Sequence, residues 1–489
     1  MIDATDAFEP PGPGGWKRLG DHFPGALTAE YRALYSETCP PGMASYLERY
    51  GVLARTIDVA FVHGHLYITP VPLAGPRQIS RTPPHAAVWL LSRLHPGFRR
   101  RNRAAARALA ERPWRDVAAR WFDRERSEWR ARSQALQDED PASMDADRLS
   151  DHLHRCRDLA GAGYRRHFEL HGDDLLPIGL LFARCEEWGV DPTVAATAIA
   201  GASPPPTATG EPPAWQLVTG YDLDSLAWCE LDHRRPVEPP AAHALIDLHD
   251  RVPSEHHEEL DGLVADARAA VPLRDDNGVY TAAWPVGLLR RVMLEVGRRI
   301  GLHDEQHAVE LTVAELDTRL HGAATPPADE AAARAATRRV DSARPAPATL
   351  GPEFAIPPLS ALPRPLALIG AAQVAAADHM VEREDAAAAA VGADAYTGRA
   401  LVVDDPTDAF DLIEPGDVVI TTATSPTWNV VLGEAGAIVT SSGGLLSHAA
   451  VLARELGIPA LIGAGPVQER IRTGMTVTVD PTAGTVTAA

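Results

Sequence analysis

One contiguous segment, residues 443–460, constrains the local fold of this 489-residue chain more than any other. It reads Gly-Gly-Leu-Leu-Ser-His-Ala-Ala-Val-Leu-Ala-Arg-Glu-Leu-Gly-Ile-Pro-Ala. A double glycine favours a turn, Ser447 is a preferred helix N-cap residue, and Gly457 with a proline two residues later is typical of a helix end. The segment therefore predicts a strand, a tight turn and a helix from His448 to Leu456.

Short apolar runs surround this segment and are typical of strands. Residues 392–489 combine these short strands with one clear helix, which is typical of a compact domain of about 100 residues. We therefore expect a small β/α domain at the C-terminus, with strands at Ala400–Val403, Asp417–Ile420, Gly436–Thr440, Ala460–Ile462 and Thr476–Val479.

The rest of the chain has a different pattern. Residues 1–325 are mostly helical by periodicity, apart from a β-hairpin around Gly64 within Asp58–Thr69. Residues 326–391 are rich in proline and alanine, which favours a linker region containing one Ala-rich helix. The sequence thus predicts a multidomain α+β protein: a mostly helical domain 1–325, a linker 326–391 and the domain 392–489.

Charge and lysine content exclude some functions. The chain has 46 basic and 66 acidic residues and a net charge of −20, which disfavours nonspecific nucleic-acid binding and docking on anionic lipid. Lys17 is the only lysine, and no P-loop is present, so we do not expect this chain to bind ATP alone in either common way. We interpret the basic run Arg99–Arg103 as a solvated or salt-bridged helix start.

Cysteine content and the N-terminal composition indicate the compartment. Cys39, Cys156, Cys185 and Cys229 have no metal-ligand spacing and are too few for a disulfide scaffold, so we expect reduced core residues. Residues 1–15 lack the basic and apolar regions of a signal peptide. We therefore expect a cytoplasmic protein that binds neither membranes nor nucleic acid.

His448 is the residue with the clearest chemical potential. In the first turn of a helix, backbone N–H groups and the positive dipole end favour an anion and disfavour an imidazolium. A neutral imidazole beside an anion site is what phosphoryl transfer onto histidine requires. The expected phosphate-binding residues are Gly443, Gly444 and Ser447; the alternative is a helix-capping histidine in an inactive domain.

The same segment closely resembles the phosphohistidine, or swivelling, domain of the phosphoenolpyruvate synthase and pyruvate phosphate dikinase superfamily. Its Gly-Gly-Leu-Leu-Ser-His form is most similar to the rifampin phosphotransferase and phenylphosphate synthase branches. The resemblance continues through residues 415–420, 425–428 and 457–463. Leu446 stands where dikinases have a regulatory threonine, and Tyr396-Thr-Gly398 stands where a Ser-Pro-Gly turn is usual.

The resemblance implies a β/β/α swivelling domain at residues 392–489 and a helical acceptor-binding domain in residues 1–325. It implies that His448 accepts the phosphoryl group and passes it on. Because the ATP-grasp domain of the family is missing before the helical part, we expect a separate ATP-grasp subunit to supply ATP and Mg²⁺, with no cofactor held tightly by this chain. The acceptor would be a small organic molecule.

Acceptor-binding candidates in the helical part each have a structural alternative. His63 and His65 would share one strand face across Gly64, which is also common for a buried hairpin face. Trp114 recurs with Trp121 and Trp129 on one helix face, where core packing is the default. The remaining candidates are Arg291 and Arg298, which share a helix face and suit bidentate phosphate binding or an ion-pair network.

No metal site is expected. His167 and His171 stand four apart on a helix, as metal ligands can, but no third ligand is anchored in the sequence.

Two other functions remain open. In the first, phosphorylation serves only to activate the acceptor, and the net reaction is a dehydration or another elimination in biosynthesis. Alternatively, the protein is a noncatalytic phosphocarrier or regulatory module whose histidine is modified without an acceptor. The sequence identifies neither the acceptor nor the oligomeric state.

Overall fold

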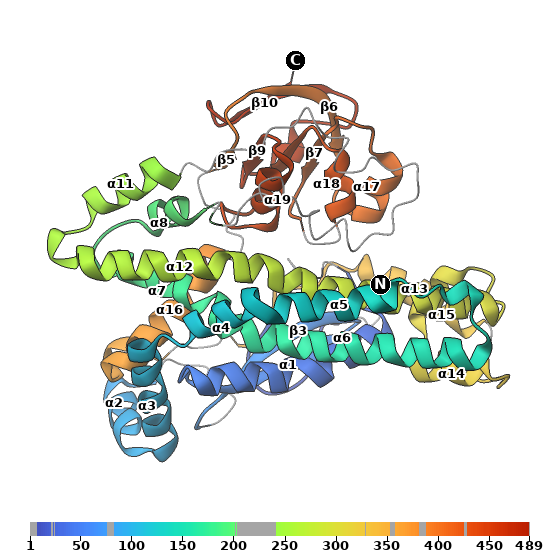
Figure 1. Cartoon of the computed structure of the whole chain (residues 1–489), viewed down its shortest axis with the longest axis horizontal. Helices are drawn as coiled ribbons and strands as arrows, with labels where there is room; N and C mark the ends of the chain where they lie inside the picture. The colour runs from blue at the N-terminus through green and yellow to red at the C-terminus, as the bar shows by residue number, and fades with distance from the viewer. Residues whose placement is uncertain are drawn as a thin grey trace. The chain divides into compact units, whose positions relative to one another are not determined.

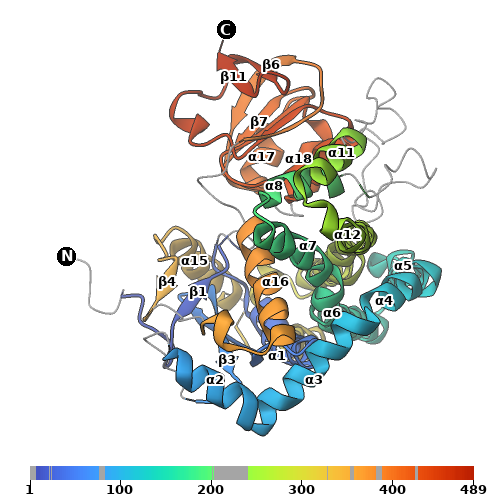
Figure 2. The same ribbon diagram turned by 90° about the vertical axis from the view of Figure 1, so that its left-hand side faces the viewer.

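The computed structural model describes residues 7–20, 23, 25–75, 83–200, 202, 241–327, 329–352, 357–380, 388–424 and 428–488. By its contacts the chain divides into two compact units. The first comprises residues 1–172 and 280–370, and the second comprises residues 173–279 and 371–489. Each unit contains helices and one β-sheet, so the protein is a multidomain α+β protein. The ribbon is shown in Figures 1 and 2.

Helices dominate the first unit, and their buried faces follow the expected periodicity. Trp114, Trp121 and Trp129 are all buried, which confirms that this stripe packs in the core. The helices are α1 (Ala29–Arg49), α2 (His85–Leu94), α3 (Pro96–Glu111), α4 (Trp114–Arg120), α5 (Arg126–Gln137), α6 (Ala146–Asp174), α13 (Trp284–Arg299), α14 (Val313–Leu320) and α15 (Glu330–Ser342), with short π or 3₁₀ turns at Trp121–Glu125, Pro141–Ser143, Gly278–Ala283, Glu305–Glu310 and Leu359–Ala361.

The sheet of the first unit has the order β2-β3-β1-β4. The expected hairpin is confirmed: β2 (Ala54–Val62) and β3 (His65–Pro72) pair antiparallel, and Val62 faces His65. His63 and Gly64 form the turn with φ of 48° and 75°. The other strands are β1 (Trp16–Arg18) and β4 (Thr349–Leu350), which pair with each other.

The Pro/Ala-rich segment 326–391 is more structured than the composition suggests. It contains α15, β4, α16 (Arg364–Met380) and β5 (Ala389–Val391). Figure 2 shows β4 beside β1, with which it pairs. Part of the expected linker therefore belongs to the first unit. Alanine has a high helix propensity, so an alanine-rich segment can form a helix instead of a flexible linker.

The second unit includes helices from the middle of the chain, which the expected division at residue 325 assigned to one helical domain. One reason is a close approach between helices: a Cβ at Gly179 would lie 2.1 Å from the Ala372 carbonyl oxygen on α16. Only glycine permits this packing. These helices are α7 (Leu176–Glu187), α8 (Pro192–Ile199), α11 (Ala241–Arg251) and α12 (His257–Asn277).

The C-terminal part of the second unit contains a seven-stranded sheet of order β11-β10-β6-β7-β8-β9-β5. Strands β6 to β9 pair parallel, whereas β5, β10 and β11 pair antiparallel at the edges. All five expected strands are confirmed within a few residues. They are β6 (Tyr396–Val402), β7 (Val418–Thr421), β8 (Ala437–Thr440), β9 (Ala460–Ile462) and β10 (Thr476–Asp480), followed by β11 (Thr485–Ala488).

Helices α17 (Pro406–Leu412), α18 (Asn429–Glu434) and α19 (His448–Leu456) accompany this sheet (Figure 1). Apolar residues of α18 and α19 form one buried cluster with Val419, Ile438 and Ile462 of the strands. A second cluster includes Val418, Val439 and Val477. Both faces of the central strands are thus buried, as parallel sheets require. Among the described residues, no helix is long and apolar enough to span a bilayer.

Candidate phosphohistidine site

A glycine turn leads from β8 into α19. Gly443 has a φ of +115°, and an added Cβ there would lie 3.0 Å from Ile462 Cγ2 and 3.2 Å from Ser447 Oγ. The backbone N–H of Ser447 donates to the Gly444 carbonyl at 2.9 Å. Gly463, at the end of β9, has a φ of +72°, and a Cβ there would meet the Gly443 carbonyl oxygen at 2.7 Å. Glycine is therefore needed at residues 443 and 463 to bring this turn close to the sheet.

Helix α19 begins and ends where the sequence predicts. Ser447 is its N-cap, and its Oγ accepts a hydrogen bond from the Ala450 N–H at 3.4 Å. Gly457 ends the helix in the left-handed conformation. Arg454, in the last turn, donates from Nη1 to the Leu445 carbonyl at 2.9 Å, so it connects the two ends of the helix.

His448 is the first residue of α19 and is partly buried. Its Nδ1 lies 2.8 Å from Oγ1 of Thr424, a buried residue just after β7. Loss of hydration and, to a smaller extent, the positive charge of Arg274 on α12 lower the pKa of His448 to about 4. The imidazole is therefore neutral at neutral pH, as expected for this helix position.

This arrangement suits a nucleophilic imidazole. The contact with Thr424 involves Nδ1. When Nδ1 carries the proton, the lone pair of the neutral ring is on Nε2. The backbone N–H groups in the first turn of a helix have no intrahelical partner and attract anions. Gly443, Gly444 and Ser447 come directly before that turn, as their expected role in phosphate binding requires.

Sequence reasoning missed Thr424. No spacing relative to His448 indicates it, since the two residues are 24 positions apart. They meet because β7 and β8 are parallel neighbours, so the segments that follow the two strands start at the same edge of the sheet. The sequence signal that could have indicated Thr424 is a polar residue just after a buried strand.

Tyr396 and Gly398 lie within β6 and not in a turn. The Tyr396 hydroxyl donates to the Gly416 carbonyl at 2.7 Å. A Cβ at Gly436 would lie 2.2 Å from that hydroxyl oxygen. In this chain, Tyr396 therefore ties β6 to the loops before β7 and β8.

His63 and His65 do not share a strand face, because His63 lies in the hairpin turn. The two rings are near each other, and both lie close to Asp341 on α15. His65 Nε2 is 2.9 Å from the Asp341 carbonyl oxygen, and His63 Nδ1 is 4.0 Å from its carboxylate. Burial lowers the pKa of His65, whose side chain is almost inaccessible. The structure therefore places these histidines next to α15, and their role in acceptor binding stays a prediction.

Trp114, Arg291 and Arg298 also contact other residues of the chain. Trp114 is buried against Tyr50, with ring centroids 6.1 Å apart. Arg291 donates to the carbonyls of Gln137 and Glu139 at 2.8 and 3.0 Å. Arg298 forms two hydrogen bonds to Glu295 at 2.8 and 2.6 Å. Arg291 and Arg298 therefore bind different partners within the chain. Their role in acceptor binding stays a prediction.

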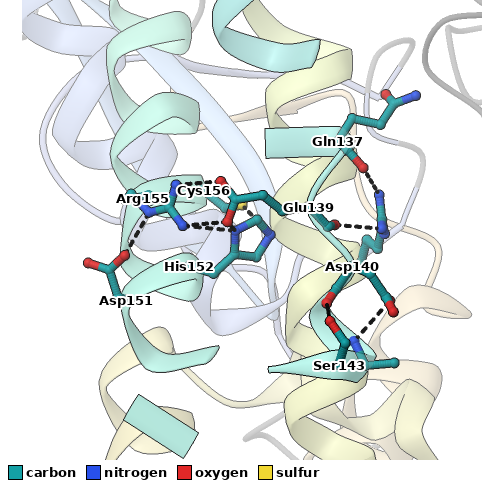
Figure 3. Close-up of polar contacts among 10 residues, drawn as sticks. Gln137, Glu139, Asp140, Ser143, Asp151, His152, Arg155 and Cys156 are labelled. Carbon is teal, nitrogen blue, oxygen red and sulfur yellow. Dashed lines mark hydrogen bonds and ion pairs between the residues drawn. The ribbon is translucent and has the colours of Figure 1, made fainter. Parts of the chain in front are cut away.

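The segment that Arg291 binds leads into a polar cluster on α6 (Figure 3). Arg155 donates to both carboxylate oxygens of Glu139 at 2.7 Å and to Asp151 at 2.8 Å. His152 Nδ1 lies 3.3 Å from Glu139, and Cys156 Sγ lies 3.7 Å from His152 Nε2. Burial raises the pKa of the Cys156 thiol to about 12, so this cysteine is not a nucleophile at neutral pH.

Cys39, Cys156 and Cys185 are buried and reduced, as expected, whereas Cys229 lies outside the described residues. The rings of His167 and His171 are 4.6 Å apart on α6. In the described ranges, no group of three or more His, Cys, Asp or Glu side chains is arranged to hold a metal ion.

Comparison with known proteins agrees with this site. Residues 413–484 match the family described as PEP-utilising enzyme, mobile domain. Phosphoenolpyruvate synthase of Aquifex aeolicus is 48% identical over 90 residues, which are 18% of this chain and 10% of that protein. Phosphoenolpyruvate synthase of Escherichia coli is 54% identical over 67 residues, 14% of this chain and 8% of that protein.

A third relative has a less specific name. The uncharacterized phosphotransferase YvkC of Bacillus subtilis is 43% identical over 91 residues, 19% of this chain and 11% of that protein. The chain thus spans only about a tenth of the length of these curated relatives. Residues 413–484, which include His448, are therefore similar to the mobile domain of the PEP-utilising enzymes.

Proposed function

We propose that the chain is a phosphotransferase component that carries a phosphoryl group on His448. The observation that supports this most is the neutral imidazole at the start of α19, oriented by Thr424 through Nδ1. It lies in a domain whose relatives include phosphoenolpyruvate synthases and a phosphotransferase. Neutrality, orientation and an anion-binding helix end are together the requirements for phosphoryl transfer to histidine.

The proposed first step forms one bond and breaks one. The Nε2 lone pair attacks a phosphorus atom of ATP, a P–N bond forms, and the P–O bond to the leaving nucleotide oxygen breaks with its electron pair. The first-turn N–H groups of α19 stabilise the charge on the transferred oxygens. In the second step an oxygen of the acceptor attacks the phosphorus, and the P–N bond breaks.

The proposed source of the phosphoryl group is ATP bound with Mg²⁺ on a separate ATP-grasp subunit. One lysine in 489 residues and no P-loop motif support this assignment, because ATP-binding folds usually use lysine on the phosphates. Mg²⁺ would neutralise charge on the nucleotide during transfer. The proposed acceptor is a small organic molecule bound by the helical part of the chain.

The experiment that tests this function mixes the full chain with ATP, Mg²⁺ and the ATP-grasp protein encoded nearest its gene. We expect intact-mass analysis to show one added phosphoryl group that is acid-labile and absent from His448→Ala. Product analysis with acceptors then separates three outcomes: a stable phosphorylated product supports the phosphotransferase, and an unsaturated product with free phosphate supports elimination. Modification of His448 without consumption of any acceptor supports a phosphocarrier.

A further inference from the structure

A pocket in the first unit has no role in the proposed function. It has a volume of about 410 Å³ and lies where α1, β2, the loop after β3 and the start of α3 meet. This volume is in the range of small-molecule sites. Its lining includes Ala44 and Leu73, which give it an apolar part, and the polar residues Glu48, Arg55, His95, Arg100 and Arg101.

Arg101 is the unusual member of this lining. The sequence indicated a solvated helix start for the basic run of which it is part, but its side chain is only 4% exposed. Nη2 donates to the Ala54 carbonyl at 3.2 Å. Within the part of the chain that the structure describes, Nε and Nη1 of Arg101 have no hydrogen-bond partner. A buried guanidinium that lacks partners for two nitrogens is costly unless something binds there.

The nearby charges neutralise this guanidinium only in part. Arg55 and Arg100 also line the pocket, and both are exposed. Glu48 is the only acidic residue of the lining, and its carboxylate lies 3.7 Å from Nε of Arg100, another arginine of the lining. Burial lowers the pKa of Arg101, the charge of Glu48 raises it in part, and the charge of Arg100 lowers it. The lining therefore contains three arginines and one carboxylate, which leaves an excess of positive charge.

Backbone geometry holds the pocket in place. Gly51 follows α1 with a φ of +76°, and a Cβ there would lie 2.3 Å from the Arg101 carbonyl oxygen. This close approach places α3 directly against the end of α1. At the start of α3, the His95 side chain accepts a hydrogen bond from the Gly97 N–H at 3.1 Å, and both residues line the pocket. The positive end of a 16-residue helix therefore adds to the charge of the arginines.

We propose that this pocket binds the carboxylate or phosphate group of a small organic molecule, with the buried Arg101 guanidinium as its main ligand. Carboxylate and phosphate oxygens both accept charge-assisted hydrogen bonds from a guanidinium. In Arg101 the two nitrogens without a partner are Nε and Nη1. Their N–H groups point to different sides of the guanidinium, so each donates a single hydrogen bond to its own oxygen. Ala44 and Leu73 contact the apolar part of the ligand.

This proposal goes beyond the phosphohistidine function and does not depend on it. All residues of the lining lie between residues 44 and 101 in the first unit, whereas His448 is in the second unit. Binding in the pocket and phosphorylation of His448 therefore fail or succeed separately.

The test is calorimetric titration of the full chain with inorganic phosphate and, separately, with benzoate, at constant ionic strength. The key variant is Arg101→Met, which removes the unpartnered nitrogens while keeping the apolar stem, so we expect its thermal midpoint to stay unchanged or rise. Arg101→Lys keeps the charge but loses the fixed directions of the guanidinium N–H groups. Arg103→Met is the matched control, since it removes the same charge from an exposed position of α3 outside the pocket.

We expect saturable binding of at least one probe, weakened about tenfold or more in Arg101→Met and less in Arg101→Lys. Arg103→Met and His448→Ala should bind like the unaltered chain. Binding of phosphate alone or of benzoate alone identifies which oxyanion the pocket prefers. The proposal is overturned if neither probe binds saturably, or if Arg103→Met weakens binding as much as Arg101→Met does.

Discussion

The region around His448 and the pocket around Arg101 are both built to meet an anion, but they use opposite charge states. Burial keeps His448 neutral, so its ring can form a covalent bond to phosphorus. Arg101 is more completely buried than His448 but keeps a guanidinium, which binds an oxyanion without reacting. The difference shows that a site with little water suits transfer or reversible binding depending on the side chain.

The protonation of His448 should give the largest effect. Its folded-state pKa of about 4 lies below the ordinary value of 6.5, so its contribution to stability is fully present above pH 6.5 and is lost as the pH falls toward 4. We expect an NMR titration of the histidine Cε1 protons to place His448 near pH 4. His321 is the control, because the Asp317 carbonyl raises the pKa of this exposed histidine.

A His448 midpoint near that of ordinary histidines would contradict the neutral nucleophile. The unfolding free energy of His448→Ala should also fall less steeply between pH 6.5 and 4 than that of the unaltered chain.

The two regions also differ in how much of them could be predicted from sequence. The turn, the N-cap, the helix and the helix end follow one another within residues 443–457. Local capping and turn preferences are therefore enough to place His448 at the start of the helix. Arg101 is surrounded by residues of α1, β2 and a loop, and its burial depends on Gly51 meeting its carbonyl. No local pattern encodes such a meeting, and five basic or polar residues in a row read as a solvated surface.

The rest of the fold follows the same division. Periodicity placed the strands β6 to β10 and the hairpin β2–β3, because each is a local pattern. It did not separate residues 173–279 from the other helices, since that grouping depends on tertiary contacts such as that of Gly179 with Ala372. Thr424 was missed for the same reason.

Substitution of the two turn glycines tests how far the His448 region depends on its backbone. Gly443→Ala should destabilise the protein by about 1–3 kcal/mol, because residue 443 needs a positive φ. Gly444→Ala is the matched control: a Cβ there meets nothing within 4 Å, and we expect a change below about 0.5 kcal/mol. Calorimetric unfolding measures both. Equal effects would show that the turn does not need its glycine at 443.

Substitution of Thr424 tests the orientation of the ring. Thr424→Val keeps the shape but removes the hydroxyl that contacts Nδ1, and we expect histidine phosphorylation to slow about five- to tenfold. Thr424→Ser should restore most of the rate. If valine and serine slow the reaction equally, Thr424 acts through packing and does not position the imidazole.

Arg298 should show the smallest effect. It pairs with Glu295 on an exposed surface, so Arg298→Ala should change the unfolding free energy by less than about 0.5 kcal/mol and leave phosphorylation of His448 unchanged. The rate of transfer from phosphohistidine to an acceptor is the second measurement. A large loss of that transfer would assign Arg298 to acceptor binding and would add a third anion site to the comparison.

The central claim is that His448 accepts a phosphoryl group, and reaction with phosphoramidate tests it without a partner protein. Intact-mass analysis and fragmentation of the full chain should show one acid-labile phosphoryl group on His448, formed faster than on any of the other histidines. His448→Ala should lack that fast phase. A chain that is phosphorylated at other histidines while His448 stays unmodified would contradict the account.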